Sequence, residues 1–383
     1  MNRREFVIGA GSVAGIVVLM PGMASAEPNR IDWYTGSDTN ILDFWSNIVK
    51  PKFEAANPGV TMNLVDGGDG DGLQAIAERA LAAMQTKTDP RADMFEEYDP
   101  RLPKGSIEAG LWTDFSKAGL SNYGRLNPLT FDTAYNMPWH GSQVLLGYDT
   151  TKLKPADAPK TWEALVAWIK ANPEQFIYCR PDKGGSGNNF IQRAVYQANG
   201  LNPDAFTLDN FSPEKAKAML DPAWELLKEI GPYTFGKGGY TSGNTQSVQL
   251  LSQNAVTMIT VWSDHALSSI AQGVLPETTG LVQLDDLALS GGYAQMVVFA
   301  NAVNHEVTMK LCDFVLSDEI QKLVVDELAG FPAIRWEFLP PEMQAKFAPV
   351  IAKTMPNFPG GDWTASVTDG WYRNVAPNVD RNG

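Results

Sequence analysis

The amino-acid sequence predicts an α/β protein with two domains, each a mainly parallel sheet flanked by helices. Two observations support this prediction. At 383 residues the chain is too long for one ordinary hydrophobic core, so two domains are expected. Strand patterns and helix patterns also alternate along the chain, and strands connected through helices pair in parallel through right-handed crossovers.

The first domain begins with a strand pattern at residues 30–34. Apolar residues at helical spacing predict a helix over 41–49, and a second strand is predicted at 60–65. An alanine-rich helix follows over 73–84, and a third short strand at 92–95. Ligands of such sheets bind beyond the carboxyl ends of the strands, so the residues that follow these three strands are expected to border a binding site.

The sequence DGGDGDG at residues 66–72 comes directly after the second strand. Its acids approach the spacing of a calcium-binding loop, but Gly67 stands where that loop requires its first aspartate. Three aspartates would also repel an anion drawn to the glycine amides. The stretch is therefore expected to be a loop at the rim of the site, in which Asp71 caps the next helix and the acidity favours a positive ligand.

The second domain is predicted to begin near residue 150. Helix and strand patterns continue to alternate through it, and a glycine-rich turn at 184–188 leads into a helix from about Asn189. The other predicted elements are helices at 161–165, 213–230 and 246–253, strands at 176–179, 255–261 and 295–300, and a final helix at 309–316.

The first 26 residues have the pattern of an export signal. Arg3 and Arg4 precede an apolar run at 7–20, and small residues then predict cleavage after Ala26. The paired arginines followed by Phe6 favour a twin-arginine signal, and a general secretory signal that carries two arginines is the alternative. The apolar run is shorter than the ~20 residues of a bilayer span, so no membrane anchor is expected.

The net charge of −14 excludes several classes of partner. Affinity for nucleic acid depends on neutralising phosphates, so an acidic chain is not expected to bind DNA or RNA. The same charge disfavours anionic lipid surfaces. Cys179 and Cys312 are the only cysteines, and two buried free thiols are expected rather than a disulfide.

Three groups of motifs in the mature chain, up to about residue 335, resemble a known family. In order they are FEAANPGV at 53–60; PWHG, LGYD and PKTW at 138–141, 146–149 and 159–162; and FVLSDE and GFP at 314–319 and 330–332. Their order and spacing resemble the periplasmic solute-binding proteins of ABC importers (extracellular solute-binding family 1). The cluster that they resemble includes spermidine/putrescine, thiamine and ferric-iron binders.

This resemblance implies a type II periplasmic-binding-protein fold, in which two lobes joined by a hinge enclose a ligand. Lobe one would comprise residues 27–145 and 290–335, and lobe two residues 150–285, while the assignment of 336–383 stays open. The implied protein is a soluble periplasmic monomer without a cofactor. Its implied partners are a small-molecule solute and the membrane permease of an ABC importer.

The expected ligand-binding residues lie at predicted strand ends or in loops that such a cleft would use. Neighbours on a strand point to opposite faces, so only one of two adjacent glutamates is expected to enter the cleft. For each aromatic ring, packing in the core is the alternative. The candidates are Trp33, Tyr34, Asp38, Asp71, Glu96, Glu97, Trp139, Ser186, Tyr240, Trp262 and Asp264.

Two kinds of ligand chemistry remain open. Carboxylates beside aromatic rings suit a cationic or hydroxyl-rich solute, since charge pairing and cation–π contact act together. The glycine-rich turn at 184–188 could instead present backbone N–H groups to an anion, and a zwitterion would use both. A plain helix cap is the alternative for this turn.

Metal binding and catalysis are less well supported. The three histidines, His140, His265 and His305, are dispersed, and no adjacent tyrosine pair suggests a ferric site. An exported hydrolase is the alternative function, but the sequence around Ser186 lacks the second glycine of Gly-x-Ser-x-Gly. The sequence therefore predicts a binding protein and not an enzyme.

Overall fold

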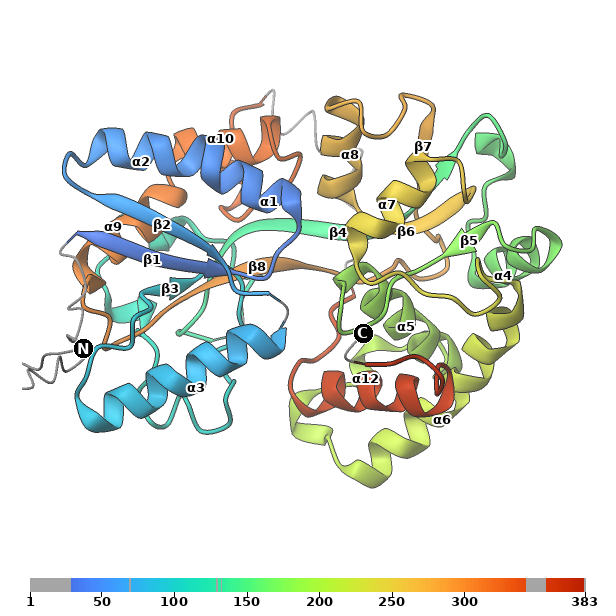
Figure 1. Ribbon diagram of the computed structural model, residues 1–383, viewed down its shortest axis with the longest axis horizontal. Helices are drawn as coiled ribbons and strands as arrows, with labels where there is room; N and C mark the ends of the chain where they lie inside the picture. The colour runs from blue at the N-terminus through green and yellow to red at the C-terminus, as the bar shows by residue number, and fades with distance from the viewer. Residues whose placement is uncertain (1–28, 69, 129, 132, 342–355, 382–383) are drawn as a thin grey trace, which may run out of the picture.

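The molecule consists of two halves that share one mixed sheet, with helices on both faces (Figure 1). The structure is a computed structural model and describes residues 29–68, 70–128, 130–131, 133–341 and 356–381. The predicted export signal therefore lies outside the described residues. No helix within these ranges is long and apolar enough to span a membrane.

The first half is built on three parallel strands, in the order β2 (Thr61–Asp66), β1 (Arg30–Thr35) and β3 (Met94–Phe95). One hydrophobic core joins β1 to helices that lie on one face of these strands: α1 (Thr39–Phe44), α2 (Lys50–Ala56), α9 (His305–Val315) and α10 (Asp318–Asp326). Helix α3 (Gly70–Thr86) covers the other face (Figure 1).

The second half is built on β5 (Phe176–Ile177), β6 (Met258–Trp262) and β7 (Thr279–Val282). Its larger core holds α4 (Trp162–Ala171), α5 (Gly185–Ala198), α6 (Pro213–Ile230) and α12 (Asp362–Asn374). A smaller core on the opposite face holds α7 (Asn244–Ser252) and α8 (Ser263–Ala271). The helix predicted at 213–230 is confirmed with the same bounds.

Two long strands connect the halves. The chain leaves the first half along β4 (Met137–Asp149) and returns along β8 (Gly291–Val298), so these strands run antiparallel. Up to Gln143, β4 pairs with β8, and from Val144 it pairs with β6. The strand order is β2-β1-β3-β8-β4-β6-β5, with β7 and β9 (Phe331–Pro332) each paired to β4.

The α/β fold class is confirmed, but the prediction of mainly parallel sheets is wrong for the connecting strands. Parallel pairing is confirmed for β1–β2, β1–β3 and β5–β6. The five other pairs that the structure describes are antiparallel, and all of them involve β4 or β8. These two strands carry the chain out and back between the halves, without the helical crossover that makes neighbouring strands parallel.

The helix predicted at 41–49 is longer and less regular than its pattern indicates. A turn of π-helix at Trp45–Val49 separates α1 from α2. Pro51 follows in the first turn of α2; it has no N–H group, and its ring excludes the carbonyl of residue 47 from normal helical geometry. A local π turn relieves this conflict while keeping Trp45 and Val49 buried.

The C-terminal segment, which the sequence left unassigned, packs on the second half. Trp363 and Trp371 of α12 are fully buried in the core that contains α5 and α6. Both cysteines are free and buried, as predicted. The residue boundaries of the two lobes stay a prediction from the resemblance.

Candidate binding cleft

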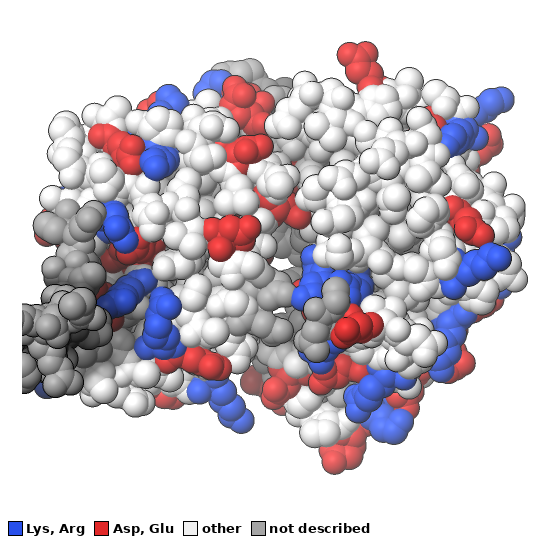
Figure 2. All heavy atoms as spheres, in the orientation of Figure 1, with Lys and Arg blue, Asp and Glu red and all other residues white. Residues whose placement is uncertain are grey.

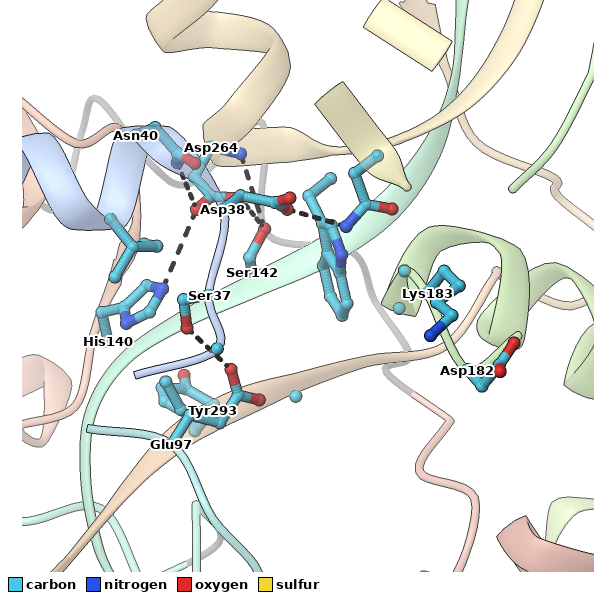
Figure 3. Close-up of a pocket in the computed structure, with 18 of the residues that line it drawn as sticks. Ser37, Asp38, Asn40, Glu97, His140, Ser142, Asp182, Lys183, Asp264 and Tyr293 are labelled. Carbon is cyan, nitrogen blue, oxygen red and sulfur yellow. Dashed lines mark hydrogen bonds and ion pairs between the residues drawn. The ribbon is translucent and has the colours of Figure 1, made fainter. Parts of the chain in front are cut away.

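A cleft of about 290 Å³ lies between the two halves, over the connecting strands β4 and β8. The loop after β1 and the start of α1 border the cleft on the first half. The C-terminal end of β6 and the N-terminal end of α5 border it on the second half (Figure 3). Figure 2 shows a hollow at the centre of this face, with acidic side chains above it and basic ones to its right. The polar and charged side chains in its lining are Ser37, Asp38, Asn40, Glu97, His140, Ser142, Asp182, Lys183, Asn244 and Asp264.

The cleft is acidic. Among the described residues that line it, four are carboxylates and one is a lysine: Asp38, Glu97, Asp182 and Asp264, against Lys183. The only other titratable nitrogen in this lining belongs to His140. Burial lowers the pKa of His140 to about 3, so this imidazole is neutral and adds no positive charge to the lining.

Glu96 and Glu97 have different roles, as the alternation along a strand predicts. Glu96 is fully buried behind the cleft and accepts hydrogen bonds from Trp139 Nε1 at 2.7 Å, Thr35 Oγ1 at 2.8 Å and Ser37 Oγ at 2.6 Å. Glu97 lines the cleft and stays accessible from it. Desolvation by the surrounding protein, followed by the charge of Glu96, raises the pKa of Glu97 to about 7.

Asp264 lies at the first residues of α8, where β6 ends. Its buried carboxylate accepts hydrogen bonds from Ser142 Oγ and, at 3.1 Å, from Asn40 Nδ2. His140 Nε2 lies 3.8 Å from the same carboxylate. Desolvation raises the pKa of Asp264, although the hydrogen bond from Ser142 opposes this effect.

Asp38 immediately precedes α1 and faces the second half across the cleft. It accepts a hydrogen bond of 2.7 Å from Asn244 Nδ2, at the start of α7, and lies 3.7 Å from His265 Nδ1. Burial acts to lower the pKa of His265, but its interactions with Asp38 and Asp264 outweigh burial and raise it. Together with the Asn40–Asp264 bond, these contacts join side chains of the two halves directly.

Two of the amides at the glycine-rich turn are bonded inside the protein. Helix α5 begins at Gly185, earlier than the predicted Asn189. Its second and third amides are bonded inside the protein: Ser186 N–H donates to Asn244 Oδ1 at 3.2 Å and Gly187 N–H donates to Cys179 Sγ at 3.2 Å. A Cβ atom at position 187 would lie 1.8 Å from the Cys179 carbonyl oxygen, so this glycine permits close packing.

Four of the predicted site residues line the cleft, and the structure places most of the others in packing positions. Asp38, Glu97, Trp262 and Asp264 are in the lining. Ser186 is fully buried next to it and donates a hydrogen bond of 2.7 Å to Asn244 Oδ1.

The predicted aromatic residues other than Trp262 lie outside the cleft lining. Trp33 and Trp139 are fully buried in the core of the first half. Tyr34 packs against Phe95, and Tyr240 packs against Tyr178 and Trp371. The side chain of Asp71 lies outside the described residues.

The acidic loop does not border this cleft through its described residues. Asp66 is exposed and accepts a hydrogen bond from Gly68 N–H. The backbone of Gly68 instead lies against Gly36, where a Cβ atom would be only 2.4 Å from the Gly68 carbonyl oxygen. No group of three or more potential metal ligands occurs among the residues that the structure describes.

Several lining residues were not predicted from the sequence, namely Ser37, Asn40, His140, Ser142, Asp182, Lys183, Asn244 and Tyr293. For some of these residues, the sequence contained a signal that could have predicted them. Ser37 and Asn40 directly follow β1, and Asp182 and Lys183 follow the strand near 176–179, where ligands of such sheets bind. His140 and Ser142 had none, because they lie within a strand whose position between the halves is a tertiary property.

Comparison with known proteins supports a single family. The model of the family described as "Bacterial extracellular solute-binding protein" matches residues 49–348. A curated relative, Protein YnjB of Escherichia coli (strain K12), is 24% identical over 247 residues. That match spans 61% of this chain and 61% of the relative, which is less than two thirds of the relative's length.

Solved structures show the same fold. A periplasmic thiamin binding protein superposes with a TM-score of 0.65 at 16% identity, over 92% of this chain and 98% of that one. The spermidine/putrescine ABC transporter substrate-binding protein PotD from Streptococcus pneumoniae gives a TM-score of 0.64 at 14% identity, over 90% and 98%.

Proposed function

The chain belongs to the bacterial extracellular solute-binding protein family, and we propose that it captures a small polar organic solute between its two halves and delivers it to an ABC importer. The observation that carries this proposal is the cleft over β4 and β8, to which both halves contribute charged side chains. A solute that contacts both halves binds the closed form better than the open form, and the permease would recognise the closed form. In this proposal the protein acts by binding its solute and not by converting it.

Among the solute classes that the sequence left open (cation, zwitterion, anion and polyol), a cationic solute is favoured. Four carboxylates line the cleft against one lysine, so a positive group would gain a charge pairing that an anion or a neutral polyol lacks. The partly buried ring of Trp262 lies in the same lining and can add a cation–π contact. Two of the α5 amides that could have held an anionic group, those of Ser186 and Gly187, are bonded elsewhere.

Binding by the purified mature chain tests this function. A thermal-shift screen with spermidine, putrescine, glycine betaine, glucitol and inorganic phosphate should raise the melting temperature most with the polyamines, because a ligand that binds only the native state stabilises it. Asp38→Asn and Asp264→Asn should each weaken binding of the best cation, measured by calorimetry. The loss should reach ~30-fold or more, since an unpaired buried charge costs about 2–5 kcal/mol.

Asp43→Asn is the matched control. Asp43 is exposed on α1, the helix that begins directly after Asp38. It should leave the dissociation constant unchanged. A response to glucitol or phosphate without a response to any cation would overturn the cationic class. Unchanged affinity in both cleft variants would reject the cleft itself as the binding site.

Export to the periplasm belongs to the same proposal. Replacing Arg3 and Arg4 by lysines should block export through the twin-arginine route. Fractionation of cells that express the full chain would measure this. Unaffected export would assign the signal to the general secretory route instead.

A further inference from the structure

A second cavity of about 850 Å³ opens beside the cleft. Three residues line both spaces, namely Glu97, Gly292 and Tyr293, so the cavity and the cleft meet there. Like the cleft, this cavity lies between the halves, because its walls come from 97–101 and 127–136 of the first half and from 206–208 and 357–360 of the second. We call it the ring chamber.

The lining of the ring chamber differs chemically from that of the cleft. Beyond the shared Glu97, the charged residues among its described lining are Asp99 and Arg101, which pair with each other at 3.0 Å. The rest of the lining is rich in aromatic rings and amides: Tyr98, Phe131, Phe206, Tyr293 and Phe358, with Asn127, Asn136, Gln295 and Asn357. The chamber is therefore close to neutral, whereas the cleft is acidic.

Two polar atoms of this lining have no hydrogen-bond partner. Gln295 donates through Nε2 to the Thr130 carbonyl at 2.7 Å, which fixes the amide and leaves Oε1 unpaired. The hydroxyl of Tyr98 is also unpaired, and the backbone N–H of Tyr98 donates to the Gln295 carbonyl at 3.1 Å. Both unpaired atoms are buried behind the surface of the chamber, so a bound group would pair with them only where the lining shifts to expose them.

Tyr293 is held in place at the junction of the two spaces. Its ring lies against the backbone of Gly141 on the neighbouring strand, where a Cβ atom would be 2.7 Å from the ring. Burial raises the pKa of Tyr293 to about 12, so the ring is an uncharged wall shared by both spaces. A molecule that passes Glu97 and Tyr293 would leave the acidic cleft and enter the neutral chamber.

We propose that the ring chamber is a second subsite for the solute, and that it takes an uncharged ring bearing hydroxyl or amide groups. This inference rests on the proposed function, because the ring would be joined to the positive group held in the cleft. Aromatic side chains stack on flat or sugar-like rings, and the amides bond to their substituents. The cleft alone, at about 290 Å³, is at the lower end of the range for ligand pockets, and the chamber supplies the remaining volume.

Three probes separate the two subsites: ethylamine carries the positive group alone, 4-ethylphenol carries the hydroxylated ring alone, and tyramine carries both. Calorimetry on the mature chain should show that tyramine binds at least tenfold more tightly than ethylamine. 4-Ethylphenol should bind more weakly than tyramine by a similar factor. Equal affinity for tyramine and ethylamine would overturn the ring chamber while leaving the cationic receptor intact.

Labelling of a single introduced cysteine tests whether the ring of tyramine occupies the ring chamber. Both native cysteines are fully buried, and Leu208 lies in the chamber lining with 42% of its surface exposed. Leu208→Cys should therefore be the reactive thiol toward a maleimide, and tyramine should slow its labelling several-fold while ethylamine should not. Val303→Cys, at a position that is 55% exposed and outside both linings, is the matched control and should label at the same rate with either amine.

The outcomes distinguish failure of the chamber from failure of the function. Tight tyramine binding without protection of Leu208→Cys would place the ring elsewhere and overturn the chamber. If 4-ethylphenol binds as tightly as tyramine and protects the cysteine, the chamber stands and the cationic class fails. If none of the three probes binds, the two-part ligand is overturned, and the screen with spermidine and putrescine decides the cationic receptor separately.

Discussion

At the residue scale, the environment of each carboxylate determines whether it is bonded within the core or is free to contact a solute. Glu96 and Glu97 are adjacent in sequence, yet Glu96 is bonded to three donors in the core while Glu97 lines the cleft. The buried charge of Glu96 contributes to the raised pKa of Glu97. A positive ligand would stabilise the ionised form of Glu97, and so the pair couples solute binding to pH.

Glu97→Gln is expected to change how stability depends on pH. The pKa of Glu97 is about 7 in the folded protein, against an ordinary value of 4.5, so the folded state retains this proton to higher pH than the unfolded state. Its contribution to stability is fully present below about pH 4.5 and is lost as the pH rises through about 7. The variant should therefore melt at a higher temperature than the wild type at pH 8, with little difference at pH 4.5.

Thermal melts at the two pH values measure this effect. The exposed Glu108 provides the control, since Glu108→Gln should shift both melts equally. The raised pKa would be contradicted if the Glu97→Gln variant and the wild type differed in melting temperature by the same amount at both pH values.

Two tryptophans in the core of the first half, Trp45 and Trp139, allow a paired test of a single hydrogen bond. Trp139 Nε1 donates to Glu96 at 2.7 Å, whereas Trp45 Nε1 has no partner. Both rings are fully buried and contact each other, so Trp→Phe removes a similar volume in each. Trp139→Phe should lower the free energy of unfolding by about 1–3 kcal/mol more than Trp45→Phe, because it leaves a buried carboxyl oxygen of Glu96 without this donor. Equal urea midpoints for the two variants would show that this bond does not stabilise the fold.

At the element scale, glycines allow close packing rather than ligand binding. The glycines that open α5 let its backbone approach Cys179 and Trp262. In α12, Gly370 lies against Trp224 of α6, and this contact holds the C-terminal helix on the second half. The same sequence signal, a glycine beside polar residues, is compatible with a ligand loop or with tight packing.

Gly370→Ala is expected to destabilise the protein, although Gly→Ala in an open helix stabilises by up to ~1 kcal/mol. A Cβ atom at this position would lie 2.4 Å from the buried ring of Trp224, and the resulting overpacking should cost about 1–3 kcal/mol. Chemical denaturation would measure the change. Ser366→Ala, one turn earlier on the same helix and facing a groove, is the control and should be near neutral. A more stable Gly370→Ala variant would show that α12 is loosely packed.

At the scale of the whole molecule, direct hydrogen bonds join the two halves across the cleft. Asp38 and Asn40 of the first half bond to Asn244 and Asp264 of the second. Each of these bonds lowers the differential affinity that a solute needs in order to hold the halves together.

Asn244→Asp is expected to open the molecule at neutral pH. The change keeps the shape of the side chain and the acceptor for Ser186, but it replaces the donor to Asp38 with a second carboxylate. Loss of a bond worth about 1.5–3 kcal/mol should shift the equilibrium toward the open form by roughly 10–100-fold. The radius of gyration from small-angle scattering should increase, and solute affinity should fall. Gln249→Glu, exposed on the same helix, should leave the radius unchanged; an unchanged radius in Asn244→Asp as well would show that the bond does not control closure.

Much of the architecture could be predicted from the sequence, because it depends on local periodicity. The strands β1, β2 and β6, the helix α6 and the α/β class follow from apolar spacing over short windows. Of the site, Asp38, Glu97, Trp262 and Asp264 were predicted because they follow strands, where ligands of such sheets bind.

The remaining site residues required the tertiary structure. Trp139 and Trp262 both stand near strand ends, but only packing sends one ring into the core and leaves the other in the cleft. Ser142 and Asp264 are more than a hundred positions apart, and they meet because β4 changes partner from β8 to β6 between the halves. Local patterns determine which segments form strands and helices, whereas long-range pairing determines which side chains share a cavity; the sequence therefore determined the fold class, and the tertiary structure decided the composition of the cleft and of the ring chamber.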